Sequence, residues 1–486
     1  MMTRRTFVKG AAALAATPAM ADSELDPWQA MGRSLSREHG FEPAEVLGTL
    51  PTGLNGTLYR NGPGLLESFG KRYAHLFDGD GAITAFRFFG GGAQGASRVL
   101  ETPELLDERA AGKMLYTSGA TPAPTWGKRV GGKVKNTANT SVLAWAGQTL
   151  ALWEGGAPTA FDPNTLDCLG QTKLGGTVQM TFSAHPHAVA ARGKLYNFGL
   201  RYGRDTLVDL YELNPDGTSR LMASHPLPAG TGMLHDFIAT EKHFVFFVSP
   251  LVLSPWLLLA GVRAPLDTRN FSWKAERGTD VMVVPIDEPT KISRFRTDAF
   301  WQWHFANAFD DGDDVVVDFS RYRDASSFTQ LGTDYLDEGG IQEGGFLHRA
   351  RVSPKTGGFT SEQVWDMAVE FPKVHPGVEG SRARYAWGVV SAPNTATPDG
   401  LSRIDAETGD AVALQMPDGW FPTEPVPVAK GDDELDVWVL SLVWDSTRDV
   451  SGVAVWDGHA PEAGPVGSAW LDHPVPITFH GAWAPA

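Results

Sequence analysis

Short apolar runs separated by turn residues recur along almost the whole chain, and they limit the fold more than any other feature. The runs have four to seven residues, and Gly, Asp and Pro mark tight turns between them, as in Asn214-Pro215-Asp216-Gly217. Only residues 104–111 have a helical pattern. Strands of this kind are typical of a sandwich, a barrel or a propeller, so we expect an all-β fold. The expected strands are 141–145, 150–153, 194–199, 244–248, 281–285, 315–319, 386–390 and 437–443.

The pattern alone leaves the architecture open between a propeller and two sandwiches, because no internal repeat is visible. Residues 22–486 divide into seven units of about 66 residues, somewhat longer than the roughly 40–50 residues of common propeller repeats. Asp162-Pro163-Asn164-Thr165 and Asp405-Ala406-Glu407-Thr408 resemble each other. They suggest equivalent turns in different units.

The first 21 residues have the pattern of an export signal. Arg4 and Arg5 precede an apolar run, and small residues follow at Ala19 and Ala21. Paired arginines before a short apolar segment are typical of twin-arginine export. We therefore expect residues 1–21 to be a signal, residues 22–486 to form one domain, and the protein to be exported to the periplasm.

Charge and cysteine content exclude two classes of function. The formal net charge is −16, and nucleic-acid binding needs basic patches. Cys168 is the only cysteine, which rules out an intrachain disulfide and any metal site built on several thiolates.

One apolar run later in the chain, from Leu251 to Ala260, bears on membranes. It is too short to span a bilayer, which takes about 20 apolar residues. Burial in the core is the commoner fate of such a run. The other possibility is an exposed patch that makes peripheral contact with a membrane surface.

Four histidines stand in four distinctive settings. His185 lies in Ser-Ala-His-Pro-His, His235 in Met-Leu-His-Asp-Phe, His304 in Gln-Trp-His-Phe-Ala-Asn and His480 in Thr-Phe-His-Gly. Imidazole is the commonest neutral metal ligand, and a set of His without thiolate suits Fe, Cu, Ni or Zn. Each histidine alone is more often structural, and His187 is a rival to His185.

These settings resemble those of the carotenoid cleavage oxygenases. Further phrases similar to that family are Leu54-Asn55-Gly56-Thr57-Leu58-Tyr59-Arg60-Asn61-Gly62-Pro63-Gly64, His75-Leu76-Phe77-Asp78-Gly79-Asp80-Gly81 and Asn136-Thr137-Ala138-Asn139-Thr140. The resemblance implies a seven-bladed β-propeller whose loops and short helices form a cap over a metal site. It also implies one Fe(II) held by His185, His235, His304 and His480, with His75 in the scaffold.

The resemblance extends to the surroundings of the metal. It implies that Glu154, Glu370 and Glu424 each orient one ligand histidine, while His185 has no such partner. Ligating imidazoles commonly donate their second N–H to a carboxylate. The aromatic residues near these positions are candidate walls of a substrate tunnel or simply core packing: Trp153, Trp301, Trp303 and Phe305.

The implied activity is cleavage of a conjugated C=C bond by O2 into two carbonyl products. Stilbene-cleaving members of the family carry Lys just before the first Glu, where this chain has Trp153, so an apolar carotenoid or apocarotenoid is the expected substrate. A lignostilbene-type dioxygenase is the alternative, and one branch of the family isomerises its substrate instead. A secreted binding propeller without enzymatic activity is the alternative of another class.

Overall fold

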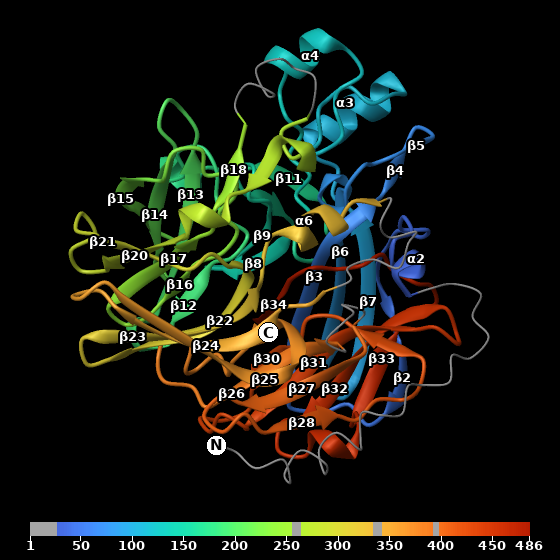
Figure 1. Cartoon of the computed structure of the whole chain (residues 1–486). Coiled ribbons are helices and arrows are strands. Elements are labelled where there is room, and N and C mark those ends of the chain that lie inside the picture. The colour runs from blue at the N-terminus through green and yellow to red at the C-terminus, as the bar shows by residue number, and fades with distance from the viewer. Residues whose placement is uncertain (1–26, 255–263, 334–342, 392–397) are drawn as a thin grey trace.

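Antiparallel sheets surround a central axis in the computed structural model, which describes residues 27–254, 264–333, 343–391 and 398–486 (Figure 1). The predicted export signal lies outside these residues. Every strand expected from the sequence is present to within a few residues at its ends. The expected helix is α3 (Pro103–Ala111), whose first turn is capped by Thr102 Oγ1 accepting from Leu105 N.

The sheets are the seven blades of a propeller, as the family resemblance predicted. From the axis outwards, blade 1 contains β34 (Gly481–Pro485), β3 (Gly56–Leu65), β6 (Asp80–Phe89), β7 (Gly92–Val99) and β1 (His39–Pro43). Blade 2 contains β8 (Ser141–Trp145), β9 (Gln148–Leu152), β10 (Thr159–Phe161) and β11 (Cys168–Gln171). Blade 3 contains β12 (His187–Val189), β13 (Lys194–Arg201), β14 (Leu207–Leu213) and β15 (Ser219–Pro226). Blade 4 contains β16 (Ile238–Ala239), β17 (His243–Val248), β20 (Thr279–Pro285) and β21 (Ser293–Thr297).

Blades 5 and 6 share one long strand, so their strands form a continuous sheet. Blade 5 contains β22 (Trp301–Asp311), β23 (Asp314–Tyr322), β24 (Phe346–Ser353) and β25 (Gly358–Lys373). The last residues of β25 pair with β26 (Tyr385–Ser391) and open blade 6, which continues with β27 (Gly400–Asp405) and β28 (Ala411–Leu414). Blade 7 contains β29 (Trp420–Pro422), β30 (Val426–Ala429), β31 (Val437–Asp445), β32 (Val450–Asp457), β33 (Gly467–Trp470) and β2 (Glu45–Gly48).

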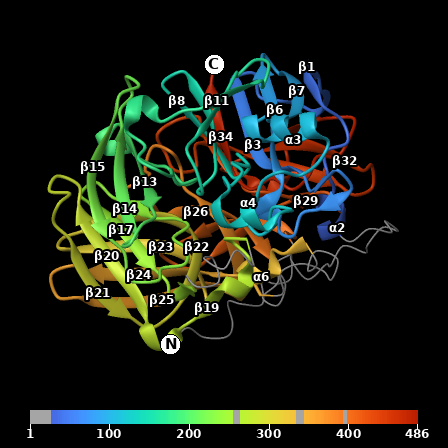
Figure 2. The same ribbon diagram turned by 90° about the horizontal axis from the view of Figure 1, so that it is seen from above.

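Strands from both ends of the chain close the ring. β2, from the N-terminal part, pairs with β33 at the outer edge of blade 7. β34, from the C-terminal part, pairs with β3 in blade 1. In the view from above, blue and red segments accordingly lie side by side (Figure 2).

Successive residues of an inner strand pack against different neighbouring blades. In β17, Phe244 and Phe246 belong to the core between blades 3 and 4. Val245 and Phe247 belong to the core between blades 4 and 5. Because side chains alternate across a strand, a strand buried on both faces needs apolar residues at every position. The runs are therefore continuous rather than alternating.

The two similar turns recognised in the sequence adopt the same geometry in different blades. Asp162 Oδ1 accepts from Asn164 N and Thr165 N after β10. Asp405 Oδ1 accepts from Glu407 N and Thr408 N after β27. The carboxylate substitutes for a backbone acceptor in both turns.

Short elements lie over one end of the ring (Figure 1). They include α3, α4 (Trp126–Gly131), α6 (Ser326–Gln330), the hairpin of β4 (Glu67–Ser68) and β5 (Lys71–Arg72), and the pair of β18 (Leu251–Leu253) and β19 (Phe271–Trp273). The short helix α2 (Pro27–Met31) precedes the blades. Within the described residues, no helix is long and apolar enough to cross a membrane.

The apolar run from Leu251 to Ala260 is only partly described. Leu251 is buried in the core beneath β18 and β19, whereas Val252 and Leu253 are half-buried. Residues 255–263 lie outside the described residues, so the predicted membrane contact stays a prediction.

Candidate metal centre

All four predicted ligand histidines converge on the propeller axis. His304 lies in β22, and His480 immediately precedes β34; His185 and His235 lie just before β12 and β16. Inner strands start near the axis, so residues far apart in sequence meet there. The ligand atoms of the four side chains all lie within 4.8 Å of one another, and all four residues are buried.

The spacing of the Nε2 atoms fits a shared metal ion. His185 Nε2 lies 3.0 Å from His235 Nε2, and His235 Nε2 lies 3.4 Å from His304 Nε2. Two nitrogens bound at about 2.1 Å to one ion and at right angles are about 3.0 Å apart. The donor set contains neither thiolate nor carboxylate, which suits a divalent ion of the Fe, Cu, Ni or Zn type.

Each of the three predicted glutamates lies at the Nδ1 atom of a different histidine. Glu154 Oε2 lies 2.8 Å from His235 Nδ1. His304 Nδ1 is 2.5 Å from Glu370 Oε2, and His480 Nδ1 is 2.8 Å from Glu424 Oε1. A carboxylate at Nδ1 keeps the proton there and leaves the Nε2 lone pair free for a metal.

Every blade thus contributes one residue to this arrangement. Blades 1, 3, 4 and 5 supply the histidines, while Glu154, Glu370 and Glu424 come from blades 2, 6 and 7. The centre consequently depends on the complete ring rather than on any one sheet.

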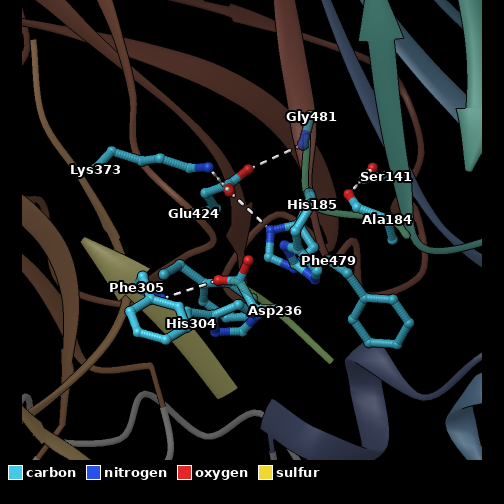
Figure 3. Close-up of polar contacts among 12 residues, drawn as sticks. Ser141, Ala184, His185, Asp236, His304, Phe305, Lys373, Glu424, Phe479 and Gly481 are labelled. Carbon is cyan, nitrogen blue, oxygen red and sulfur yellow. Dashed lines mark hydrogen bonds and ion pairs between the residues drawn. The ribbon is translucent and has the colours of Figure 1, made fainter. Parts of the chain in front are cut away.

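Glu424 is the most heavily engaged of the three carboxylates. It is fully buried, and its Oε2 accepts from Arg60 Nη1 at 2.5 Å and from Gly481 N at 2.9 Å. Lys373 Nζ lies 3.3 Å from its Oε1 (Figure 3). Although burial disfavours the charged form, Lys373, His480 and Arg60 hold the pKa of Glu424 well below its usual range.

His185 has no carboxylate partner among the described residues and is held through the main chain instead. Ser183 Oγ accepts from His185 N. Ser141 Oγ donates to the carbonyl of Ala184, the residue before His185, at 2.5 Å (Figure 3).

Burial keeps two of the imidazoles neutral. It lowers the pKa of His480 to about 3 and that of His185 well below its usual value. For His235 burial acts in the same direction, but Glu154, Asp236 and Glu370 together outweigh it and raise the pKa. Neutral imidazoles are the form that binds metal.

Two other histidines considered from the sequence, His187 and His75, lie outside the cluster. His187 Nε2 contacts Asp236 Oδ1 at 3.0 Å and its Nδ1 contacts Glu379 Oε1 at 3.1 Å. His75 Nδ1 accepts from Phe77 N, and its Nε2 lies 3.0 Å from Phe328 O. Both are held by protein groups, as expected for His75.

An apolar cavity adjoins the cluster. It encloses about 980 Å³ of empty space including its opening. His235, His304 and His480 line its inner end, and no Lys or Arg is among the described residues of its wall. Its other lining residues include Met31, Phe77, Trp303, Leu331, Val389 and Phe479. Such a space suits an elongated apolar ligand.

Of the candidate tunnel residues, only Trp303 lines this cavity. Trp301 is buried edge-on against Trp303 at 5.0 Å between ring centroids. Phe305 follows His304 in β22 and packs in the core between blades 4 and 5. Trp153 is buried beside Glu154 and packs over Gly155. The register of β22 against β23 shifts on both sides of Phe305, which separates it from Trp303 despite their two-residue spacing.

Three cavity residues were not identified from the sequence as site residues. The Phe371 ring packs against His304 with 4.9 Å between centroids and a tilt of 31°, and Phe371 has a positive φ of 51°. Tyr322 donates to Glu370 Oε1 at 2.6 Å, and Thr140 lines the wall near His480. The position of Phe371 directly after Glu370 was a usable signal, but the irregular register of β25 that turns it inward was not visible.

The chain is similar in sequence and in structure to known oxygenases. The family described as retinal pigment epithelial membrane protein matches residues 32–485. Apocarotenoid-15,15'-oxygenase of Synechocystis sp. is 29% identical over 490 residues, covering 96% of this chain and 98% of the relative. Lignostilbene-alpha,beta-dioxygenase isozyme III of Sphingomonas paucimobilis is 27% identical over 486 residues, covering 93% and 96%. The crystal structure of cobalt-substituted Synechocystis apocarotenoid oxygenase matches with a TM-score of 0.86 and 28% identity, covering 94% of this chain and 98% of that chain.

Proposed function

The chain belongs to the retinal pigment epithelial membrane protein family, which is the carotenoid cleavage oxygenase family recognised from its motifs, and on this premise we propose that it is a non-haem Fe(II) dioxygenase. Its reaction is cleavage of one conjugated C=C bond of a carotenoid or apocarotenoid by O2, with one oxygen atom entering each of two carbonyl products. The observation that carries the proposal is the convergence of four buried His beside an apolar cavity that three of them line.

His185, His235, His304 and His480 would hold the iron through Nε2, since Glu154, Glu370 and Glu424 face Nδ1 of three of them. When bound, the iron supplies a place for O2 beside the alkene. The protein's own part is to hold the polyene along the apolar wall and to exclude water from it.

The wall of the cavity favours an apolar substrate over a hydroxystilbene. Recognition of a phenolate calls for a cation, and the described wall residues include no Lys or Arg. The relative from Sphingomonas paucimobilis keeps stilbene cleavage as the second candidate. The relatives named above are oxygenases, so a non-enzymatic binding propeller has no support from them.

The test is to load the protein with Fe(II) without oxygen, quantify bound iron, and expose it to air with an apocarotenal or a hydroxystilbene. We expect paired carbonyl fragments from the apocarotenal by mass spectrometry, lost in His304→Ala. Cleavage of the stilbene alone would reassign the substrate. Absence of iron and of products from both would refute the oxygenase proposal.

We also propose export through the twin-arginine route, supported by Arg4 and Arg5 before the apolar run. Replacing both by Lys should leave an uncleaved precursor in the cytoplasm, measured by fractionation.

Peripheral membrane contact through the run from Leu251 to Ala260 is proposed on its apolar character. Trp256→Glu with Leu258→Glu should reduce co-sedimentation with lipid vesicles while leaving the iron content unchanged.

A further inference from the structure

Asp236, the residue after the ligand His235, is shared by three of the four ligand-bearing segments. It is almost fully buried, and its Oδ2 accepts from the backbone N–H of Phe305, the residue after His304, at 2.9 Å (Figure 3). Its Oδ1 accepts from Phe237 N at 2.8 Å. One carboxylate therefore joins the backbone of blade 4 to that of blade 5 directly beside two ligands.

The same carboxylate reaches the segment of the third ligand. Asp236 Oδ1 lies 3.0 Å from Nε2 of His187, which follows His185 by two residues. The other nitrogen of His187 contacts Glu379 Oε1, and that oxygen also accepts from Ala188 N. His187 is thus fixed at both ring nitrogens and ties blade 3 to Asp236.

This connection matters most for His185, because no glutamate contacts it among the described residues. Two main-chain contacts hold its segment, from His185 N to Ser183 Oγ and from Ser141 Oγ to the carbonyl of Ala184. The spacing between its segment and the other two is set by His187 through Asp236.

We propose that Asp236 and His187 are positioning residues that set the mutual distances of His185, His235 and His304 and thereby the affinity of the centre for its metal. The inference rests on the proposed metal centre. It adds the contacts that link the ligand-bearing segments to one another, which the three glutamates do not make. Groups that orient metal ligands in this way commonly change metal affinity about 10–100-fold when removed.

An amide at position 236 breaks the connection in either orientation. Both carboxylate oxygens accept from backbone N–H groups, those of Phe237 and Phe305. An asparagine offers one acceptor and one NH2 donor, so one backbone N–H always faces another donor. Asp236→Asn is therefore a disruptive change of nearly unchanged volume.

Asp318→Asn is the matched control. Asp318 is also buried, lies in β23 of the same blade as His304, and accepts from Arg349 Nε and Nη2 at 2.8 Å each. Among the described residues, its carboxylate contacts Arg349 and none of the ligand-bearing segments. The two variants remove the same charge from the interior and differ in whether the lost contacts hold ligands.

The experiment measures Co(II) affinity of the full-length apoprotein by chelator competition, the visible spectrum of bound Co(II), and the thermal midpoint of the apoprotein. We expect Asp236→Asn to weaken Co(II) binding about 10–100-fold and to shift its spectrum, with Asp318→Asn retaining wild-type affinity and spectrum. His187→Phe, which removes the link but leaves both backbone contacts of Asp236, should give a smaller change in the same direction. It also serves as the test if Asp236→Asn fails to fold.

Equal affinity and identical spectra for wild type, Asp236→Asn and His187→Phe would overturn the inference and leave the metal centre intact. Equal weakening in Asp236→Asn and Asp318→Asn would also overturn it, since general destabilisation would then account for the loss. Failure of the wild-type protein to bind Co(II) or Fe(II) would refute the proposed function itself, and the inference with it.

Discussion

Two regions of opposite chemistry meet at the four histidines. The cavity in front of them is walled by apolar side chains such as Phe479 and Val389. The frame behind them consists of buried charges, with Glu424, Arg60 and Asp236 among them. Glu370 belongs to both, since it contacts His304 and also lines the cavity. The frame fixes distances of about 3 Å between nitrogens, whereas the cavity only has to exclude water and match a shape.

This difference predicts different effects for substitutions in the charged frame and in the apolar wall. A buried frame of paired charges tolerates little, because removing one partner leaves another charge unpaired. An apolar wall tolerates more, because a lost contact costs only its own burial. Frame variants should therefore lose metal, and wall variants should keep metal and lose substrate affinity.

The largest effect is expected where the two regions meet, in His304→Ala. Loss of one of four ligands should abolish stoichiometric iron binding and product formation. Iron per chain is measured by mass spectrometry of the metal. His225→Ala is the control, because His225 is a buried histidine in β15 whose ring bonds to Pro289 O through Nε2, away from the cluster. Full iron content in His304→Ala would remove His304 from the ligand set.

Within the frame, Glu424→Gln should act more strongly than Glu154→Gln. Glu424 is fully buried between Arg60 and Lys373, whereas the Glu154 side chain is 18% exposed. Leaving Arg60 unpaired in the interior should destabilise the apoprotein by about 3 kcal/mol, and metal affinity should fall about 10–100-fold. Urea unfolding and chelator competition measure the two effects. Equal losses of stability and of metal affinity in the two variants would show that burial does not determine which carboxylate matters more.

On the cavity side, Phe371→Ala should leave iron binding unchanged and lower kcat/KM by about tenfold through a higher KM, the effect of one lost apolar contact. The ring covers His304 and His480 from the cavity. Steady-state kinetics with an apocarotenal, together with iron analysis, make the measurement. Loss of iron from this variant would mean that Phe371 belongs to the frame and not to the wall.

At neutral pH the smallest effect is expected at the buried His75, which packs against the cavity residue Phe77. Burial lowers the pKa of His75 to about 4, so its contribution to stability is present above about 6.5 and is lost as the pH falls towards 4. The free energy of unfolding should fall by up to about 1.4 kcal/mol per pH unit from this group. In His75→Gln, which retains a donor for Phe328 O, the slope between pH 6.5 and 4 should be smaller. Identical slopes by chemical unfolding would exclude His75 as the source.

The strands, turns and ligands could be predicted from the sequence to different degrees. Continuous apolar runs such as 244–248 marked inner strands, because both faces of a blade are buried. The four histidines and three glutamates were found through family motifs, and the geometry places all seven at one point. The spacing of these residues in the sequence would not by itself have predicted that seven blades bring them together.

The positions of other side chains depend on tertiary contacts that local sequence patterns do not predict. Phe305 looked equivalent to Trp303 because two-residue spacing normally shares a face, but the register shifts on both sides of Phe305 place it in the core. Asp236 resembled an ordinary acidic residue beside a ligand until its two oxygens were seen to reach Phe305 and His187. The irregular end of β25 that turns Phe371 inward likewise follows from pairing with β26.

The closure of the ring by β34 has a consequence for biosynthesis. His480 immediately precedes β34, whose partner β3 leaves the ribosome more than 400 residues earlier. Because domains begin to fold from the N-terminal side during synthesis, blades 2 to 6 can assemble while the fourth ligand is still untranslated. The proposed iron site is therefore incomplete on a nascent chain, and loading of that site would wait until translation has passed β34. In the proposed twin-arginine export, which would accept only the folded protein, closure of the ring would be needed both for metal binding and for release from the cytoplasm.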